Sequence, residues 1–184
     1  MILSILICTL EKRKGFLKTL LESLHKQMCE DVEILQHCDN GEMTTGAKRN
    51  KLVSIARGKY VVFVDDDDAV APDYIPSIIE AAKNDSDAIV FNGTMTTDGS
   101  DEKKWYISKD LPYKADTEDG KVIYLRYPNH IVPIKREIAL QVKFQDIRVG
   151  EDYLWATAIH DRGLIKTETK IDKLLYHYQY ITNK

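Results

Sequence analysis

The chain has 184 residues, of which 43% are hydrophobic and 30% charged, and its net charge is -3 at pH 7. This length predicts one domain with a single core, and the composition is ordinary for a soluble globular protein. The charge gives no reason to expect a broad nucleic-acid footprint, although a local basic groove is compatible with it.

The N-terminal segment "MILSILICTL" is apolar but far too short to cross a bilayer, and it lacks the basic start of a secretory signal. We therefore predict a buried strand there and no transmembrane segment. The cysteines Cys8, Cys29 and Cys38 are odd in number and scattered, which suits a reducing compartment, so we expect a cytoplasmic protein. A zinc site at Cys29, His37 and Cys38 is disfavoured because no CxxC pair is present and neighbours on a strand point to opposite faces.

Hydrophobic periodicity predicts alternating elements in the first third of the chain. They are a strand over 2–8, a helix over 14–27, a strand over 31–38, a helix over 44–58 and a strand over 59–65. Thr44 or Thr45 can cap the second helix and Gly58 can end it. This succession favours a doubly wound, mainly parallel sheet.

The rest of the chain is less regular. We predict a helix over 71–84, a strand over 86–94, a hairpin or insertion over 95–130, a strand around 130–140, a helix over 153–160 and a strand over 169–181. The segment 95–130 contains turn residues and several aromatics, and we expect it to lie across the rim of the sheet, where variable connections carry specificity. No repeat or linker divides the chain, so we predict one domain over 1–184.

Four carboxylates, Asp65 to Asp68, follow the strand "KYVVFVD". In doubly wound sheets, ligands bind beyond the carboxyl ends of the strands. Because Asp65 and Asp67 stand two residues apart, they can face one site in the pattern D-x-D and hold Mg2+ or Mn2+. An equally good interpretation of this run alone is an acidic turn in which Asp68 helps to cap the next helix, with Pro72 in its first turn.

A second acidic pair, Glu151 and Asp152, follows Gly150 and opens the helix "EDYLWATAIH". Taken alone, this pair is best explained as a negative helix N-terminus that the helix dipole favours.

Several segments together resemble the GT-A fold glycosyltransferases of family 2. In order, they are "SILICTLEKRKGFLKTLLESL", "CDNG", "GAKRNKLVSIARGKYVVFVDDDD", "GEDYLWA" and "LYHY". The resemblance covers nearly the whole chain and is most specific from Gly46 to Asp68. At the end of the first strand Thr9 matches the family pattern, whereas Cys8, Leu10 and Glu11 depart from it. The resemblance implies a GT-A (Rossmann-like) fold with a small antiparallel part on the acceptor side, a nucleotide-binding half over 1–94 and an acceptor-binding half over 95–184.

The resemblance implies inverting transfer of a sugar from a nucleotide-sugar donor, most often UDP-linked, to an acceptor hydroxyl. It places Asp152 as the general base, because an acceptor hydroxyl must lose its proton as it attacks, and Glu151 beside the sugars. It places Asp67 as the main Mn2+ or Mg2+ ligand with Asp65 and His177, and the metal neutralises the departing diphosphate. The implied donor-binding residues are Thr9, Glu11, Asp39, Lys48, Arg49, Asn50, Asp65, Asp66 and His130.

Some alternatives stay open. His130 can line the sugar pocket or bridge loop carbonyls. The aromatics Trp105, Tyr106, Tyr113, Tyr124 and Tyr127 can form a stacking platform for an acceptor or a small core of the insertion.

The expected partners are the donor and a glycan, lipid-linked sugar, protein or modified nucleic acid with a free hydroxyl. Because the chain is short for the family, we expect a compact soluble enzyme from a bacterial or phage-infected cytoplasm. The competing function classes are an inactive nucleotide-sugar binder, a haloacid dehalogenase phosphatase and a nucleotidyltransferase. A haloacid dehalogenase phosphatase would carry its aspartates near the start of the chain. A nucleotidyltransferase would show a glycine-rich phosphate loop after the first strand.

Overall fold

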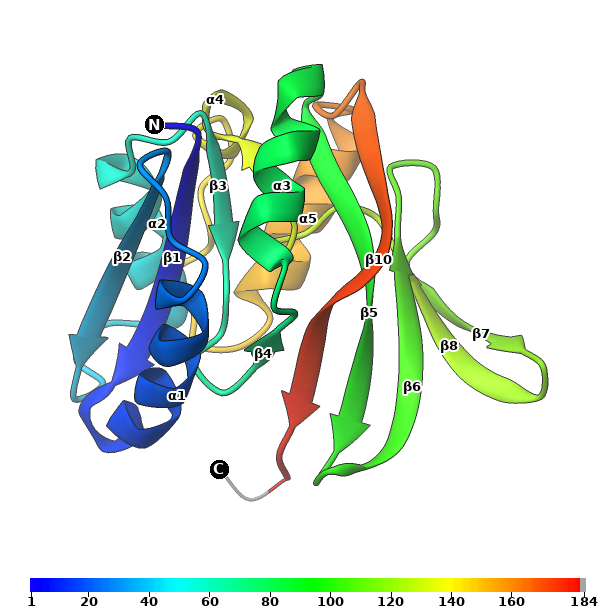
Figure 1. The fold of residues 1–184 in the computed structure, drawn as a ribbon, viewed down its shortest axis with the longest axis horizontal. Helices are drawn as coiled ribbons and strands as arrows, with labels where there is room; N and C mark the ends of the chain where they lie inside the picture. Colours follow the sequence, from blue (N-terminus) through cyan, green and yellow to red (C-terminus); the bar gives the residue numbers. More distant parts are fainter. Residues whose placement is uncertain (183–184) are drawn as a thin grey trace.

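The computed structural model describes residues 1–182, whose strands form one mixed sheet with helices on both faces (Figure 1). The sheet order is β2-β1-β3-β9-β5-β6-β8-β7, and β10 pairs with β5 and β4. The strands are β1 Leu3–Leu10, β2 Val32–Asp39, β3 Tyr60–Phe63, β4 Ala69–Val70, β5 Ala88–Thr97, β6 Ser100–Ile107, β7 Lys114–Glu118, β8 Lys121–Arg126, β9 Ile134–Lys135 and β10 Glu168–Tyr180. The helices are η1 Glu11–Arg13, α1 Lys14–His25, α2 Thr45–Ile55, α3 Tyr74–Ala81, η2 Ala82–Asn84, α4 Arg136–Ala139 and α5 Glu151–Asp161.

The first three long strands form the predicted parallel unit. β1 lies between β2 and β3 and is parallel to both. Its residues Leu3, Ile5, Leu6 and Ile7 are fully buried, which explains the continuous apolar run. Because the chain steps from β1 to β2 and then back across β1 to β3, right-handed crossovers put α1 and α2 on opposite faces of the sheet, as Figure 1 shows. The doubly wound prediction is confirmed.

Local signals fix the helices of this unit. α1 buries Leu17, Leu20 and Leu24, which recur at helical spacing on one face. α2 begins after Thr44, whose side chain accepts a hydrogen bond of 3.0 Å from the N–H of Ala47. The carboxyl ends of β1, β2 and β3 therefore meet at one edge of the sheet, the lower edge in Figure 1.

The second half adds the antiparallel part. β5 is parallel to β10 but antiparallel to β6 and β9. β8 is parallel to β6, and β7 pairs with β8 as a hairpin that projects from the body of the molecule (Figure 1). The predicted insertion is thus a continuation of the sheet through β6, β7 and β8.

Two elements differ from the sequence predictions. The strand predicted around 130–140 is wrong for most of its length, because only Ile134–Lys135 pair as β9 and Arg136–Ala139 form the short helix α4. Pro133 has no N–H for a strand ladder, and the segment "REIA" consists largely of helix formers. The two-residue strand β4, which pairs with Tyr176 and His177 of β10, was not predicted.

Candidate active site

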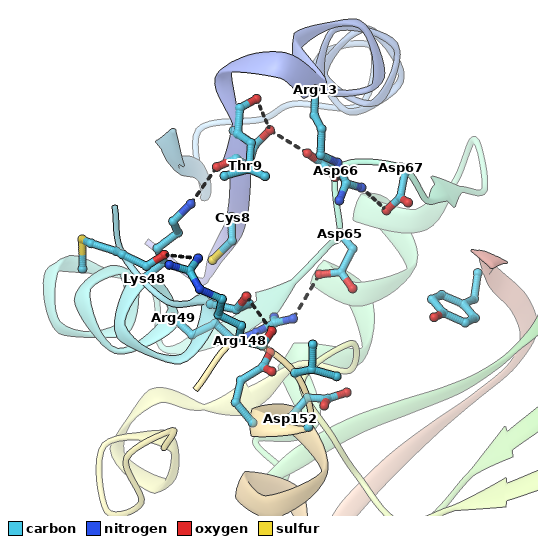
Figure 2. Close-up of a pocket in the computed structure, with 17 residues that line it drawn as sticks. Cys8, Thr9, Arg13, Lys48, Arg49, Asp65, Asp66, Asp67, Arg148 and Asp152 are labelled. Carbon is cyan, nitrogen blue, oxygen red and sulfur yellow. Dashed lines mark hydrogen bonds and ion pairs between the residues drawn. The ribbon is translucent and has the colours of Figure 1, made fainter. Parts of the chain in front are cut away.

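A cleft of about 460 Å³ opens at the carboxyl edge of β1 and β3 and reaches the start of α5 (Figure 2). It is lined by Cys8, Thr9, Leu10, Arg13, Met43, Thr45, Lys48, Arg49, Asp65, Asp66, Asp67, Arg148, Val149, Gly150, Glu151, Asp152 and Tyr178. Most of the predicted site residues therefore surround one space, although Thr9 and Asp152 are separated by 143 positions in the sequence.

The acidic run is held by partners on both sides. Asp66 accepts a hydrogen bond of 2.6 Å from the Thr9 hydroxyl and forms an ion pair of 2.6 Å with Arg13. Arg13 also lies 2.8 Å from Asp67 (Figure 2). Asp66 and Asp67 are only 3% and 5% exposed. Burial raises the pKa of Asp66, although Thr9 and Arg13 work against that rise.

Asp68 turns away from the cleft. Its carboxylate accepts hydrogen bonds of 2.6 Å from the Tyr176 hydroxyl and 2.8 Å from the Gln179 N–H, both on β10. Burial, and then the charge of Asp65, raise the pKa of Asp68 well above its ordinary value. Asp68 therefore ties the acidic run to β10, and the interpretation of this residue as a helix cap is wrong.

Arg49 joins the two acidic signals. Its Nη2 lies 3.1 Å from Asp65 and its Nε 3.0 Å from Glu151, and its guanidinium carbon stands 4.7 Å from the Phe63 ring centroid. Burial alone would raise the pKa of Asp65, but Arg49 and His130 hold it below its ordinary value. Arg49 is buried, and within residues 1–182 its Nη1 makes no hydrogen bond.

Lys48 and Asp39 organise the loop after β2. Lys48 donates a hydrogen bond of 2.9 Å to the Thr9 carbonyl and forms an ion pair with Asp39. Asp39 also accepts hydrogen bonds from the N–H groups of Gly41, at 2.9 Å, and Met43, at 3.0 Å. Partial burial would raise the pKa of Asp39, but these hydrogen bonds, above all that from Lys48, hold it below its ordinary value.

The first turn of α5 sends its two carboxylates in different directions. Glu151 is 4% exposed and faces Arg49. The Asp152 side chain is 38% exposed, lines the cleft, and lies 3.6 Å from Nδ1 of His130. Nε2 of His130 lies 3.6 Å from Asp65, and the His130 residue is 7% exposed. Asp152 is thus the accessible member of the pair.

Five predicted site residues do not line this cleft, namely Asp39, His130, Asn50, Glu11 and His177. Asn50 holds the Phe144 backbone, donating to its carbonyl at 2.8 Å and accepting from its N–H at 2.9 Å. Glu11 is exposed and pairs with Lys14 and Cys38. His177 lies within 2.7 Å of the Thr94 hydroxyl and 3.1 Å of the Thr96 hydroxyl.

The alternation of β10 explains the position of His177. Tyr176 reaches Asp68 and Tyr178 lines the cleft, whereas the residue between them faces the other way. The structure therefore does not bring His177 to the aspartates that were predicted to share a metal with it.

The cleft lining also includes Arg13, Arg148 and Tyr178, which sequence reasoning did not predict as site residues. Arg148 donates to the carbonyls of Gly41, at 2.8 Å, and Met43, at 3.4 Å, so it fastens the loop after β2 to the segment before α5. A signal for Arg13 existed, because a cation directly after the first strand must lie at the same edge as an acidic run after the third.

A second cavity of about 220 Å³ adjoins the cleft and shares Asp65, Asp152 and Tyr178 with it. Its other walls are Met95, Trp105, Ile107, Tyr113, Tyr124, Arg126, Asn129, His130 and Ile131. Trp105 and Tyr127 are buried parts of the main core, whereas Tyr113 is 38% exposed. Trp105 and Tyr127 therefore belong to the main core and not to a separate core of the insertion, and a stacking role for the aromatic residues that line the cavity stays a prediction.

The sequence model of glycosyl transferase family 2 matches residues 36–143. The chain belongs to glycosyl transferase family 2. This match confirms the family resemblance, and membership argues against the phosphatase and nucleotidyltransferase alternatives.

Two curated proteins are similar to this family 2 chain. A Bacillus subtilis protein that carries the name of a glycosyltransferase, EpsH, is 25% identical over 111 residues, which are 47% of this chain and 32% of EpsH. The glucosyl-dolichyl phosphate glucuronosyltransferase of Haloferax volcanii is 22% identical over 124 residues, which are 64% of this chain and 39% of that protein. The chain spans well under half the length of these relatives.

Solved structures of S. aureus TarS share the fold. TarS 1–349 in complex with UDP-GlcNAc superposes with a TM-score of 0.72 at 15% identity, covering 100% of this chain and 60% of that one. TarS 1–349 in complex with UDP gives a TM-score of 0.71 at 16% identity, covering 97% and 60%. The GT-A fold of this family 2 chain is thereby confirmed. Over residues 1–182, no helix is long and apolar enough to span a membrane.

The cleft carries donors that suit a hard cation. Asp65 and Asp67 both line it, and Mg2+ is usually held by one or two carboxylates together with substrate phosphates. In the described part of the chain, no cluster of three or more His, Cys, Asp or Glu side chains could hold a metal alone. These residues therefore fit a cation that arrives with a nucleotide, and such a cation must share Asp67 with Arg13 or replace it.

Proposed function

We propose that this chain is the catalytic part of a metal-dependent, inverting glycosyltransferase that moves a sugar from a UDP-linked donor to an acceptor hydroxyl. Family 2 membership and the fold shared with TarS, which is described in complex with UDP and with UDP-GlcNAc, support a nucleotide-sugar donor. The observation that carries the proposal is the position of Asp152. This residue lines the cleft, which holds cations and carboxylates, and also the aromatic cavity beside it.

On the donor side, the cleft combines cations and carboxylates. Arg13, Arg148 and Lys48 line it, and Lys48 is held by the Thr9 carbonyl and by Asp39. Guanidinium groups bind phosphate oxygens well because their planar fork matches two oxygens at once. Asp65 and Asp67 would hold Mn2+ or Mg2+, which neutralises charge on the departing diphosphate when bound. Thr9 and Asp66 keep the end of β1 against the acidic run.

On the acceptor side, Asp152 is the proposed general base. Its carboxylate is partly exposed and lines both spaces, so it can accept the proton of an acceptor hydroxyl that enters from the second cavity. His130 stands between Asp152 and Asp65, 3.6 Å from each carboxylate, and within residues 1–182 neither of its ring nitrogens makes a hydrogen bond. Glu151 is buried against Arg49, so its role is to hold α5 in place.

A release assay tests this function. The wild-type protein is incubated with Mn2+, a panel of UDP-sugars and a mixture of acceptors, and free UDP is measured over time. Asp152→Asn should lower acceptor-dependent UDP release by about a hundredfold or more, because a positioned base contributes on the order of 10²–10⁴ in rate. UDP binding by this variant should persist.

Asp161→Asn provides the matched control, since Asp161 is an exposed carboxylate at the other end of α5. It should behave as wild type. Equal release by wild type and Asp152→Asn would contradict the assignment of the base. Binding of UDP-sugars without any release would favour the inactive binder.

A further inference from the structure

The second cavity is lined by an arginine as well as by the carboxylates of Asp65 and Asp152. Arg126, the last residue of β8, lines it together with Tyr124, Trp105 and Ile107. The pairs Trp105–Tyr124 and Ile107–Arg126 stand opposite each other in the ladder of β6 and β8. These four side chains share one face of the sheet, because residues two apart on a strand point the same way.

Arg126 is fixed in this position by contacts on two sides. Its Nη1 donates to the carbonyls of Lys114, at 2.9 Å, and Leu125, at 2.8 Å. Its guanidinium carbon lies 4.0 Å from the ring centroid of Tyr113 and 5.0 Å from that of Tyr124. Aromatic faces attract cations, so the charged group is pre-organised at the wall of the cavity.

No carboxylate in residues 1–182 forms an ion pair with Arg126. In the neighbouring cleft, Arg13 and Arg49 each pair with two carboxylates, whereas Arg148 donates to two backbone carbonyls. Because Nη1 is used by backbone carbonyls, the Nε and Nη2 edge of Arg126 carries the N–H groups for a ligand. That edge is the fork that binds a carboxylate or phosphate with two parallel hydrogen bonds.

We propose that this cavity binds an acceptor that carries an anionic group, a carboxylate or a phosphate, and that Arg126 recognises this group. The inference rests on the proposed function and names the acceptor class. The anion is held at the Arg126 wall, away from Asp65 and Asp152, whose negative charges repel it. The ring of the acceptor lies against Trp105 and Tyr124, and its free hydroxyl faces Asp152.

Three small probes test the acceptor class: methyl glucoside, methyl glucuronide and glucose 6-phosphate. Their binding to the wild-type protein is measured by NMR titration, and UDP binding is measured separately on the same sample. At least one charged probe should bind about tenfold more tightly than methyl glucoside. A hydrogen bond to a charged group contributes enough binding free energy to tighten the dissociation constant by about that factor. The stronger of the two charged probes identifies the carboxylate or the phosphate as the preferred group.

Arg126→Gln should remove this preference. Arg162→Gln is the matched control, because Arg162 is exposed, lies outside the cavity and also donates from Nη1 to a backbone carbonyl, that of Gln141. It should keep the preference. Melting temperatures show whether each variant is folded. If Arg126→Gln does not fold, Arg126→Lys replaces it. Lysine keeps the charge but lacks the planar fork, so the preference for the charged probe should fall.

Equal affinity for neutral and charged probes, no binding of either charged probe, or an undiminished preference in the folded Arg126 variant would overturn the inference. A wild-type protein that binds no UDP would instead count against the proposed donor, and the comparison of probes would still decide the role of Arg126.

Discussion

Arg13 lies 2.8 Å from the carboxylate of Asp67, the residue proposed as the main metal ligand. The same guanidinium lies 2.6 Å from Asp66. An acidic run that is this deeply buried requires a counter-charge, and Arg13 supplies it from the 3-10 helix that follows β1. A divalent cation at Asp67 would also neutralise this charge, so it would compete with Arg13 for the carboxylate of Asp67.

Arg13→Gln is therefore expected to bind Mn2+ more tightly than the wild type in the absence of nucleotide. The variant should also melt at a lower temperature, because two buried carboxylates lose a partner, and Mn2+ should raise its melting temperature by more than that of the wild type. Calorimetric Mn2+ titration and thermal melts measure both effects. Lys12→Gln, an exposed change of the same charge in the same 3-10 helix, should alter neither, and unchanged Mn2+ affinity in Arg13→Gln would refute the competition.

Glu151→Ala should lower the free energy of unfolding by about 3 kcal/mol, because it removes one partner of a buried ion pair and leaves Arg49 with Asp65 alone. Urea denaturation measures this loss. Glu22→Ala is the control, since its pair with Lys18 is exposed and 4.0 Å long and should contribute less than about 1 kcal/mol. Similar losses in the two variants would show that the Arg49–Glu151 pair does not stabilise the start of α5.

In the metal-free protein, Asp68→Asn should gain stability relative to the wild type as the pH rises from about 4 to 7, although the amide can accept only one of the two hydrogen bonds that Asp68 takes from Tyr176 and Gln179. The pKa of Asp68 is raised in the folded state, by burial and by Asp65, so folding becomes less favourable as the pH rises from the unfolded pKa towards the folded one. The amide has no such cost. Below about pH 4 both side chains are neutral, so this gain should disappear. Urea midpoints in EDTA across this pH range test the prediction, and a stability difference that does not change with pH would contradict it.

Two glycines at the second position of their helices should respond in opposite ways. A Cβ on Gly46 of α2 would lie 1.8 Å from the carbonyl oxygen of Gln145, whereas nothing lies within 4 Å of a Cβ on Gly15 of α1. Gly46→Ala should cost about 1–3 kcal/mol of unfolding free energy. Gly15→Ala should gain up to about 1 kcal/mol. Thermal denaturation compares them, and a neutral Gly46→Ala would show that α2 does not contact this loop so closely.

Apart from β4, the order of the strands and α-helices up to β5 could be predicted from the sequence because its signals are local. The apolar run of β1, the helical spacing of Leu17, Leu20 and Leu24, and the cap at Thr44 each act within a few residues. The bounds of β9 could not be predicted in this way, since its two residues pair with strands far away in the chain.

The sequence predicted most of the residues that line the site but not the direction in which each side chain points. The two acidic signals do meet at the carboxyl edge of the sheet, as strand order requires. Glu151 is the buried member of the acidic pair because it bonds to Arg49, which is 102 residues away from it in the sequence. The direction of His177 likewise follows from the pairing of β10 with β4 and β5, which the sequence of β10 alone does not reveal.

The most direct test of the central claim is calorimetric titration of UDP, with and without Mn2+, into the wild-type protein and Asp67→Ala. Asp110→Ala, which changes an exposed carboxylate outside the cleft, is the control. We predict that UDP binds the wild type and the control tightly only when Mn2+ is present, and that Asp67→Ala loses this dependence together with most of the affinity. Failure of UDP to bind under any metal condition, or equal binding by Asp67→Ala and the wild type, would contradict a metal-dependent donor site at the acidic run.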